Sequence, residues 1–591
     1  MQPALRAAES GETATAILRP EETTVLIPAA GRVPEGLLSL SNIACTAMIP
    51  VAGRPVIFWT LTYLRALGLR KFRVAVPRRG LFVEDFVECT AGHDCEVTFI
   101  VPPAGPQGGL GETVATLLEQ VDTPSALIVL GDTYFQFADP AALNVAQPLV
   151  LTAPVEESYR WCVAETDARG TVSRFRDKER DLPAPLDALI GVYFLPDAAL
   201  TRRLAREVVD PERRSALPAA RVELVALLDR LRAETPIRAD RAGEWLDCGN
   251  PDRQAASHVA LLQKREFNEL SIDRTLATIT KKSRMKAKFI DEINYLRLLP
   301  PELAVLFPRV VDFSLDWQDP WLTMEYYGYA TLADAFVYEN LDPGIWHRVF
   351  QHLWRIATTA FMRYRQPLAD DVVLEMYLHK TARRLADLRG NAALAQLQEA
   401  RGLVVINGRP CQNLTALWPR LEAEVRQLAA GTLGSVIHGD LCFSNILYDL
   451  RSQICKFVDP RGSFGQAGIM GDVRYDVAKL YHSVLGLYDF ITNDLFHVSV
   501  VQRPDAALEV TLDVRVRPQQ QEILARFDEV FFGPQADGSP PLFVRREVLL
   551  ITALIFAGIP TLHYDKPQRQ VAMLATALEM LGQLYPPEGQ A

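Results

Sequence analysis

The chain has 591 residues, of which 49% are hydrophobic and 23% charged, and its formal net charge is −10. This length predicts two large domains, or three, because one hydrophobic core rarely grows so large. The acidic balance and the lack of a Lys/Arg-rich block exclude a typical nucleic-acid-binding protein. The eight cysteines form no CxxC pair and no regular framework, which favours a reduced, cytoplasmic protein.

The first 22 residues are polar and rich in Ala and Glu, without the basic start and apolar stretch of a signal peptide. We expect a flexible tail over 1–22. The longest apolar run, 548–557, is much shorter than a membrane span and predicts a buried helix. We therefore expect no membrane span.

Short apolar strands alternate with helical stretches from residue 23 to about residue 250. The expected strands lie at 24–27, 72–76, 97–101 and 126–130, and the first helix at 56–67. Fully apolar strands separated by helices predict a mostly parallel sheet covered on both faces. The predicted fold of 23–258 is therefore α/β, with a Rossmann-like (GT-A-like) sheet.

A loop of small residues, Ala29, Ala30, Gly31 and Arg32, follows the first strand directly. Such a loop lets backbone N–H groups approach phosphates, with a helix N-terminus behind them. We predict that it contacts a nucleotide, although similar loops often only turn the chain.

Further motifs follow in order along this half. They are Met48–Ile57 at a helix start, the glycine-rich loop Gln107–Thr113, Gly131-Asp132 after a strand, Gly191–Tyr193 in a later strand, and Trp245–Pro251. In this order they resemble the sugar-phosphate nucleotidylyltransferases and the related phosphocholine cytidylyltransferases, over roughly residues 23–255. The resemblance implies attack of a phosphate oxygen on the α-phosphorus of a nucleotide.

The resemblance also implies roles for single residues. Asp132 and Asp247 would jointly hold Mg²⁺, which offsets charge on both reacting groups. Gly111 and its loop, with Gln107, would approach the base, and Gly191 the second substrate. Taken alone, Asp132 is equally typical of a helix N-cap and Asp247 of a turn.

Two cationic phosphate contacts of the resembled family are missing from their places. Thr46 stands where a lysine is usual, and no arginine follows Gly31 at the usual spacing. Arg32, Arg54 or Lys178 would have to supply the charge from other positions. Alternatively, the domain binds a nucleotide without catalysing a reaction.

A predicted linker helix at 259–270 leads into the second half. There the chain shows a small sheet-rich part followed by a helical part, the order of a two-lobed, protein-kinase-like α+β domain. The expected boundaries are 271–329 for the small lobe and 330–591 for the helical lobe, with strands at 276–282 and 321–325 and a helix at 289–299.

The segment His438–Asn445 is the strongest motif of the chain. It places Asp440 and then Asn445 behind an apolar strand-like run, and Asp459 follows soon after. Protein kinases use an Asp to take the hydroxyl proton and an Asn and an Asp to hold magnesium in this arrangement. The motif therefore predicts phosphoryl transfer from a nucleotide.

Its His-Gly-Asp form resembles the aminoglycoside phosphotransferase and choline kinase superfamily, over roughly 271–591. The resemblance implies that Asp440 accepts or orients the acceptor hydroxyl and that Asn445 and Asp459 are Mg²⁺ ligands. His438 is expected to brace the loop, and Asp476 to anchor it.

A kinase also needs a strand lysine paired with a helix glutamate. Lys281 and Lys282 both end the strand at 276–282, and strand alternation favours Lys281, with Glu292 as its partner. The alternative is a solvated basic tip. Glu325 and Tyr327 are expected at the hinge against the nucleotide base.

We predict a bifunctional cytoplasmic enzyme that uses Mg²⁺ in both domains. ATP would phosphorylate a small-molecule alcohol, and its phosphate would be joined to a nucleotide, with CTP suggested by the resemblance. The product would be an activated headgroup for bacterial surface polysaccharide, as in capsule biosynthesis. The alternative is an active kinase with a non-catalytic, nucleotide-binding N-terminal domain. A protein kinase is disfavoured by the missing Ala-Pro-Glu segment.

Overall fold

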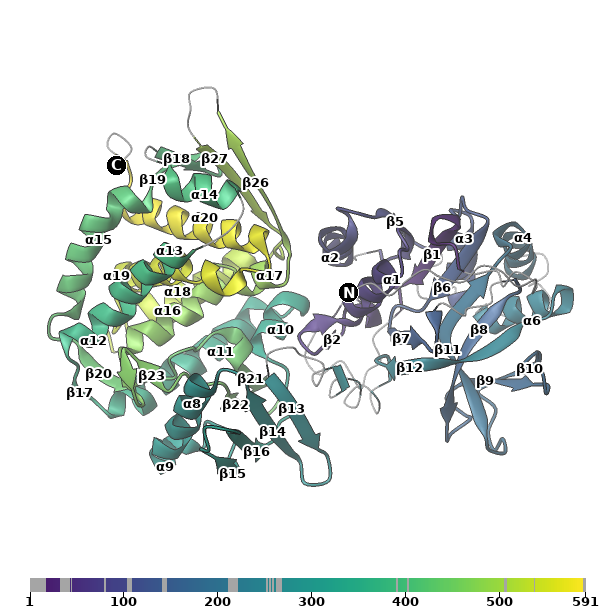
Figure 1. Ribbon diagram of the computed structural model, residues 1–591, viewed down its shortest axis with the longest axis horizontal. Helices are drawn as coiled ribbons and strands as arrows, with labels where there is room; N and C mark the ends of the chain where they lie inside the picture. The colour runs from purple at the N-terminus through teal and green to yellow at the C-terminus, as the bar shows by residue number, and fades with distance from the viewer. Residues whose placement is uncertain are drawn as a thin grey trace. The chain divides into compact units, whose positions relative to one another are not determined.

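The structure is a computed structural model that describes residues 18–31, 43, 45–78, 81–103, 109–140, 146–210, 222–250, 253, 257, 260–261, 268–388, 392–400, 403–503, 508–535 and 537–587. The chain forms two compact units, one made mostly of residues up to Ser257 and one mostly of residues from His258 onward (Figure 1). Most of the predicted tail and of the predicted linker helix 259–270 lies outside the described residues.

The first unit is built on a ten-stranded mixed sheet with the central order β5-β4-β1-β6-β11-β8-β12-β7. Its strands are β1 (Thr23–Pro28), β4 (Lys71–Ala75), β5 (Glu96–Ile100), β6 (Ser125–Val129), β7 (Thr133–Phe137), β8 (Leu149–Val155), β9 (Cys162–Thr166), β10 (Val172–Asp177), β11 (Leu186–Leu195) and β12 (Arg238–Asp247). A short hairpin of β2 (Pro50–Val51) and β3 (Arg54–Pro55) forms a separate ladder, and its residues Pro50–Arg54 belong to the second unit.

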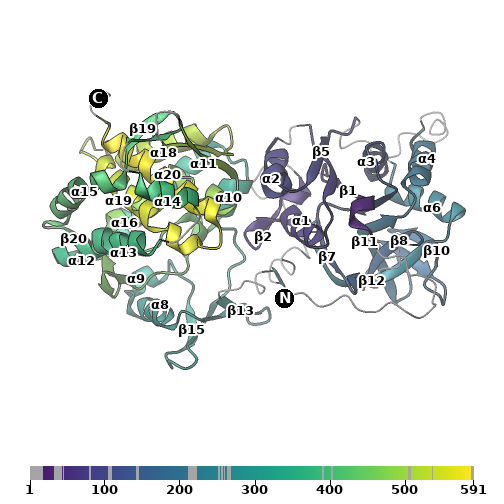
Figure 2. The same ribbon diagram turned by 45° about the horizontal axis from the view of Figure 1, so that its top comes forward.

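The parallel part of this sheet runs over β5, β4, β1 and β6. Its crossover helices are α1 (Val56–Ala66), α2 (Leu81–Ala91) and α3 (Gly109–Leu118), and α4 (Ala198–Val209) and α6 (Leu224–Glu234) follow. Right-handed crossovers that move outward from β1 place α1 and α2 on one face, and the return to β6 places α3 on the other. Figure 2 shows α3, α4 and α6 together, across the sheet from α1 and α2. The predicted mostly parallel sheet is confirmed, with antiparallel strands added after β6.

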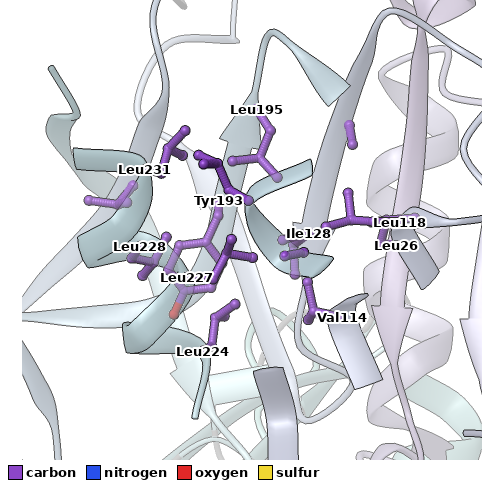
Figure 3. Close-up of a cluster of buried hydrophobic side chains, with 14 of the residues drawn as sticks. Leu26, Val114, Leu118, Ile128, Tyr193, Leu195, Leu224, Leu227, Leu228 and Leu231 are labelled. Atoms are coloured by element: carbon purple, nitrogen blue, oxygen red, sulfur yellow. The ribbon is translucent and has the colours of Figure 1, made fainter. Parts of the chain in front are cut away.

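One hydrophobic core of the first unit lies between this sheet and the layer of α3, α4 and α6 (Figure 3). Leu26 of β1 and Ile128 of β6 lie beside side chains of α3, and Tyr193 of β11 lies beside leucines of α6, among them Leu227 and Leu228. Burial of such side chains contributes roughly 1.5–3 kcal/mol each. This core therefore fixes the ends of β6 and β11, where the candidate site residues lie.

The second unit begins with an antiparallel sheet of order β13-β14-β16-β15. Its elements are β13 (Asn268–Asp273), β14 (Thr278–Ser283), α8 (Lys286–Leu298), α9 (Pro301–Ala304), β15 (Val310–Ser314) and β16 (Trp321–Glu325). Phe289 and Ile293 of α8 pack against Leu322 and Met324 of β16, so helix and sheet share one small core.

Helices dominate the described residues after position 330, as the sequence predicts. They are α10 (Leu332–Tyr338), α11 (Pro343–Arg355), α12 (Asp370–Leu374), α13 (Lys380–Asp387), α14 (Ala392–Glu399), α15 (Leu414–Ala429), α16 (Val473–Val484), α17 (Tyr488–Thr492), α18 (Gln520–Phe532), α19 (Arg545–Gly558) and α20 (Pro567–Leu584).

Short strands connect these helices. They are β17 (Gln366–Pro367), β18 (Leu403–Ile406), β19 (Arg409–Gln412), β20 (Leu433–Val436), β21 (Ile446–Asp449), β22 (Ile454–Phe457), β23 (Ser463–Phe464), β24 (Gln466–Ala467), β25 (Met470–Gly471), β26 (Phe496–Gln502) and β27 (Leu508–Val514). The hairpin β26–β27 adds to β18 and β19 in a four-stranded sheet, and the sequence pattern did not predict it.

Within the described part of the chain, the segment Arg545–His563 is the one long and apolar enough to cross a membrane by length and composition. It contains α19, and all residues from Val548 to Gly558 are buried in the second unit. A buried core helix passes the same test, as the sequence predicts for this run.

Candidate active sites

The pairing of β7 with β12 brings Asp132 and Asp247 together. Asp132 directly precedes β7, and the antiparallel register sets Asp247 opposite Thr133. The backbone N–H of Cys248 donates to the carbonyl of Asp132 at 3.1 Å. A Cβ at Gly249 would collide with the carboxylate of Asp132, so this carboxylate lies directly against the chain after β12.

Both carboxylates sit in surroundings that disfavour negative charge. Burial raises the pKa of Asp247 to about 6, and the nearby charge of Asp132 adds to the rise. Burial also raises the pKa of Asp132, although a hydrogen bond from the side chain of Thr46 opposes the rise. Oδ2 of Asp247 is buried without a hydrogen-bond partner among the described residues. A cation between the two carboxylates would satisfy this oxygen and relieve the repulsion.

The donor set fits magnesium better than a metal held by protein ligands alone. In the described ranges no group of three or more His, Cys, Asp or Glu side chains is arranged to hold a metal. Mg²⁺ is usually bound by one or two carboxylates together with substrate phosphates. Asp132 and Asp247 match that pattern.

Asp132 and Asp247 line a cavity of about 670 Å³ together with Lys178, Gly191 and Trp245. This volume falls within the roughly 300–1,000 Å³ typical of small-molecule sites. Gly191 has a positive φ of 86°, at an irregularity in the pairing of β11 with β8. The cavity therefore gathers four of the residues that the sequence predicts for metal and substrate binding.

The loop after β1 lies at the neighbouring strand end. Ala29 is buried beside Gly131, and the N–H of Thr46 donates to the carbonyl of Gly31 at 3.4 Å. The chain thus places Thr46, where the resembled family has a lysine, between this loop and Asp132. The short side chain adds no cation there.

The other predicted nucleotide contacts of this unit are only partly described. Arg32 and Gln107 lie outside the described residues. The N–H of Gly111 donates to the carbonyl of Val222 at 2.7 Å, and a Cβ at Gly111 would overlap Val222 and Glu223. Gly111 therefore packs α3 against the chain that leads into α6.

In the second unit, Lys281 of β14 points into the fold and Lys282 points out. The ammonium group of Lys281 lies 2.8 Å from Glu292 of α8 and 2.7 Å from Asp459. Burial lowers the pKa of Lys281, but the carboxylates of Asp459 and Glu292 outweigh it and raise the pKa above its usual range. Lys282 is exposed and pairs with Asp319. Lys281, Glu292 and Asp459 thus form one charged cluster, in which the lysine stays protonated.

The loop from His438 to Asn445 is held by buried hydrogen bonds. Asp476 of α16 accepts the N–H groups of His438 and Gly439 at 2.6 and 2.9 Å. Nε2 of His438 lies 2.9 Å from the carbonyl of Val458, and burial lowers the pKa of His438 to about 4. A neutral His438 ties the loop to the strand that precedes Asp459, the bracing role expected from the sequence.

Asp440 and Asn445 line one cavity, and Asp440 also lines the cleft that contains Lys281 and Asp459. Oδ1 of Asp440 pairs with Lys479 of α16 at 3.0 Å. The amide nitrogen of Asn445 donates to the carbonyl of Asp440 at 2.9 Å, which leaves the amide oxygen of Asn445 as the atom able to bind a cation. A hard cation between Asn445 and Asp459 fits this oxygen set.

Glu325 ends β16 and Tyr327 follows it, but neither residue lines the cleft of Lys281. The carboxylate of Glu325 pairs with Arg309 at 3.1 Å and accepts the hydroxyl of Tyr327 at 2.9 Å. The N–H of Tyr326 donates to the carbonyl of Ala277. Glu325 lines a different cavity together with Lys456, whose ammonium group lies 5.0 Å from the ring centre of Tyr327.

Sequence reasoning missed Lys479, Arg461, Lys380 and Arg384, which surround Asp440. One signal for Lys479 was present, because it lies three residues after the anchoring Asp476 on a helix and so on the same face. No spacing pattern links Lys380 and Arg384 to the loop, since they come from a helix 50 to 60 residues earlier in the chain.

Residues 34–264 match the family model described as Nucleotidyl transferase. No curated protein sequence matches the chain. A putative glucose-1-phosphate thymidylyltransferase from Bacillus anthracis, solved with sucrose, is 17% identical over 42% of this chain and 97% of its own, with a TM-score of 0.34. A UDP-glucose pyrophosphorylase solved with UDP-glucose is 16% identical over 41% of this chain and 99% of its own, with a TM-score of 0.34.

HddC from Yersinia pseudotuberculosis is 15% identical over 41% of this chain and 99% of its own, with a TM-score of 0.31. At identities and TM-scores this low, these likenesses do not bear on the substrate of this chain.

Proposed function

Because the N-terminal part of the chain, residues 34–264, is a nucleotidyl transferase domain, we propose that the protein is a bifunctional enzyme. The C-terminal unit transfers the γ-phosphoryl group of ATP to a small hydroxyl compound. The N-terminal unit then couples that phosphate to a nucleotide, with CTP as the proposed partner, and releases pyrophosphate. The observation that carries the kinase half is the cluster of Lys281, Glu292 and Asp459 beside Asp440.

In the proposed kinase reaction, Lys281 binds the nucleotide phosphates and Glu292 holds its ammonium group in place. The acceptor oxygen bonds to Pγ while the bond from Pγ to the ADP oxygen breaks, and the hydroxyl proton passes to Asp440. Asn445 and Asp459 would hold magnesium, which supplies charge neutralisation of the phosphates when bound. The ion pair with Lys479 keeps Asp440 ionised and able to accept or orient the proton.

In the proposed nucleotidyl transfer, a phosphate oxygen of the second substrate attacks Pα of the nucleoside triphosphate. The bond from Pα to the bridging oxygen breaks and pyrophosphate leaves. Asp132 and Asp247 would hold magnesium, which offsets charge on both substrates when bound. Lys178 is exposed at the mouth of the cavity and supplies a cation for the phosphate of the second substrate.

One chain that holds both activities raises the local concentration of the shared phosphate intermediate. We extend the proposal to the pathway that the two resemblances suggest, a cytoplasmic route to an activated headgroup for bacterial surface polysaccharide.

The experiment is incubation of the full chain with ATP, CTP and Mg²⁺ against a panel of small alcohols, hydroxy acids and sugars, followed by mass spectrometry. A phosphorylated compound and its nucleotide adduct are expected. Asp440→Asn should lose the first product but still convert a supplied phosphate into the adduct. Asp132→Asn should show the reverse. Loss of the adduct from a supplied phosphate in folded Asp440→Asn, or loss of the phosphorylated compound in folded Asp132→Asn, would contradict this division of labour.

The second candidate is an active kinase with a non-catalytic N-terminal nucleotide-binding domain. It is favoured by Thr46, which puts a neutral side chain beside Asp132 where the resembled family has a cation. Turnover of a nucleoside triphosphate to pyrophosphate that is lost in Asp132→Ala or Asp247→Ala would exclude it.

A further inference from the structure

The cavity beside Asp440 is small and strongly cationic. It has a volume of about 160 Å³, and its lining contains four basic side chains, Lys380, Arg384, Arg461 and Lys479, but only one carboxylate, Asp440. That carboxylate makes an ion pair with just one of them, Lys479, at 3.0 Å. The cavity thus keeps an excess of basic groups.

The other three cations have neutral partners. Lys380 contacts the sulfur of Met376 at 3.4 Å, Arg384 donates to the carbonyl of Gly558 at 3.3 Å, and Arg461 donates to the hydroxyl of Tyr475 at 3.0 Å. Among the described residues, none of the three has a carboxylate within the 4.0 Å of an ion pair. Unpaired cations in a partly buried site cost free energy unless a ligand brings the opposite charge.

Lys380 and Arg384 also lie four residues apart on α13, so their like charges face each other on one side of the helix. Such pairs destabilise a helix. Burial, together with the charges of Arg461 and Arg384, lowers the pKa of Lys380 to about 6, so this lysine is largely neutral at pH 7 until a bound anion restores its charge. Both observations indicate an excess of positive charge that Asp440, the one carboxylate of the cavity lining, does not offset.

The aromatic rings of the cavity do not form a site for a cationic acceptor. The ammonium group of Lys479 lies 5.6 Å from the ring centre of Tyr488, and the guanidinium of Arg461 lies 5.9 Å from that of Tyr475. The protein's own cations therefore already lie against two of the three tyrosine rings that line the cavity, and the third, Tyr377, stacks on Tyr475.

We propose that the hydroxyl compound phosphorylated beside Asp440 carries an anionic group of its own, a carboxylate or a phosphate, and that Lys380, Arg384 and Arg461 bind that group. This rests on the proposed kinase function of the site. The cavity is smaller than the roughly 300–1,000 Å³ of drug-sized pockets, so the acceptor is a compact molecule. Apolar side chains of α19, among them Ile551 and Ile555, cover the wall of the cavity.

The competing use of these cations is the triphosphate of ATP, because Lys380, Arg384 and Arg461 also line the cleft of Lys281 and Asp459. Binding experiments distinguish an anion site for the acceptor from a site for the ATP triphosphate. Inorganic phosphate serves as the probe for the anion site, and MgATP reports the nucleotide site. Both are titrated calorimetrically into the full chain.

Arg384→Gln and Lys380→Met are each expected to lower the affinity for inorganic phosphate at least about tenfold. Each substitution removes a charge-assisted hydrogen bond to the anion. MgATP affinity should stay within about twofold. Arg383→Gln is the matched control, because Arg383 is the neighbouring residue on α13 but is exposed and paired with Glu375. It should leave both affinities unchanged. Unchanged phosphate affinity in Arg384→Gln, or an equal loss of MgATP affinity, would overturn the anion site.

A different variant tests the kinase proposal independently of the anion site. Lys281→Met should lower the affinity for MgATP and leave the affinity for inorganic phosphate unchanged. If Lys281→Met does not change the affinity for MgATP, the kinase function alone is overturned. The preferred charge of the acceptor is then tested with four compounds that share a three-carbon skeleton. They are 3-amino-1,2-propanediol, glycerol, glycerate and glycerol 3-phosphate, and the rate of ADP formation is compared among them. The two anions are expected to be the better acceptors, and a preference for the amine would contradict the anion site.

Discussion

The ammonium group of Lys479 lies 3.0 Å from Oδ1 of Asp440. Burial alone would raise the pKa of Asp440, but Lys479 and Arg461 outweigh burial and hold the pKa well below its usual range. Lys479→Met should therefore raise this pKa, because an opposite charge at this distance lowers a carboxyl pKa by about 1–3 units. The acid limb of kcat/KM for phosphoryl transfer should move to higher pH by about one unit or more.

The measurement is a pH–rate profile of ADP formation with the best acceptor of the panel. Lys479→Arg keeps the charge and should leave the acid limb close to that of the unsubstituted enzyme. An acid limb that does not move in Lys479→Met would show that the protonation of Asp440 does not control the rate.

Lys281 points into the fold and its neighbour Lys282 points out of it, so the two lysines offer a matched pair of variants. Lys281→Met should reduce ATP-dependent phosphoryl transfer on the order of 100-fold, the loss typical for a group that stabilises transition-state charge. Lys282→Met should change kcat and KM little, because Lys282 points out of the fold and pairs with Asp319 at the surface. Equal losses in the two variants would remove the assigned role from Lys281.

The sequence alone could predict Lys281 because one strand's alternation decides which of two lysines points inward. It could also predict the parallel sheet, since apolar strands and helical spacing are local patterns. The cations around Asp440 could not be predicted in this way. Lys380 and Arg384 reach the site through the packing of α13, and nothing local in their sequence marks that contact. The same holds for the hairpin of β26 and β27, in which β27 pairs with β18, about 100 residues away.

The closeness of Asp132 and Asp247 depends on the register between β7 and β12, which the sequence alone does not show. Asp247 stands opposite Thr133 only because β7 pairs with β12, a contact between segments more than 100 residues apart. The motif order along the chain indicated both carboxylates, and the structure adds the reason why they meet.

Gly249→Ala should impair nucleotidyl transfer without touching a charged group. The new Cβ would overlap the carboxylate of Asp132, so this carboxylate must shift from its present position. A displacement of about 1 Å at a reacting centre can cost about 100-fold in rate. The measurement is pyrophosphate release with a supplied phosphate substrate, and the kinase reaction of the same sample is the internal control. Normal pyrophosphate release in Gly249→Ala would show that Asp132 does not act from this position.

His482 gives a prediction for stability against pH. It is buried between the rings of Tyr488 and Phe556, and burial keeps its pKa well below the usual value in the folded chain. In the unfolded chain it titrates near pH 6.5. Below that pH the unfolded state binds more protons, so the free energy of unfolding falls as the pH falls. The contribution of neutral His482 is full above about pH 6.5 and shrinks toward acid pH.

His482→Leu removes this titration and has a similar volume. The drop in unfolding free energy of the second unit from pH 7 to pH 5 should therefore shrink by up to about 2 kcal/mol, at about 1.36 kcal/mol per pH unit. Urea titrations at both pH values measure it. Some acid sensitivity should remain, since burial also lowers the pKa of His438 and His563 to about 4. His497→Leu, at an exposed position of β26, is the control. If His482→Leu and His497→Leu lose the same free energy between pH 7 and pH 5, His482 is not the group that makes this unit acid-sensitive.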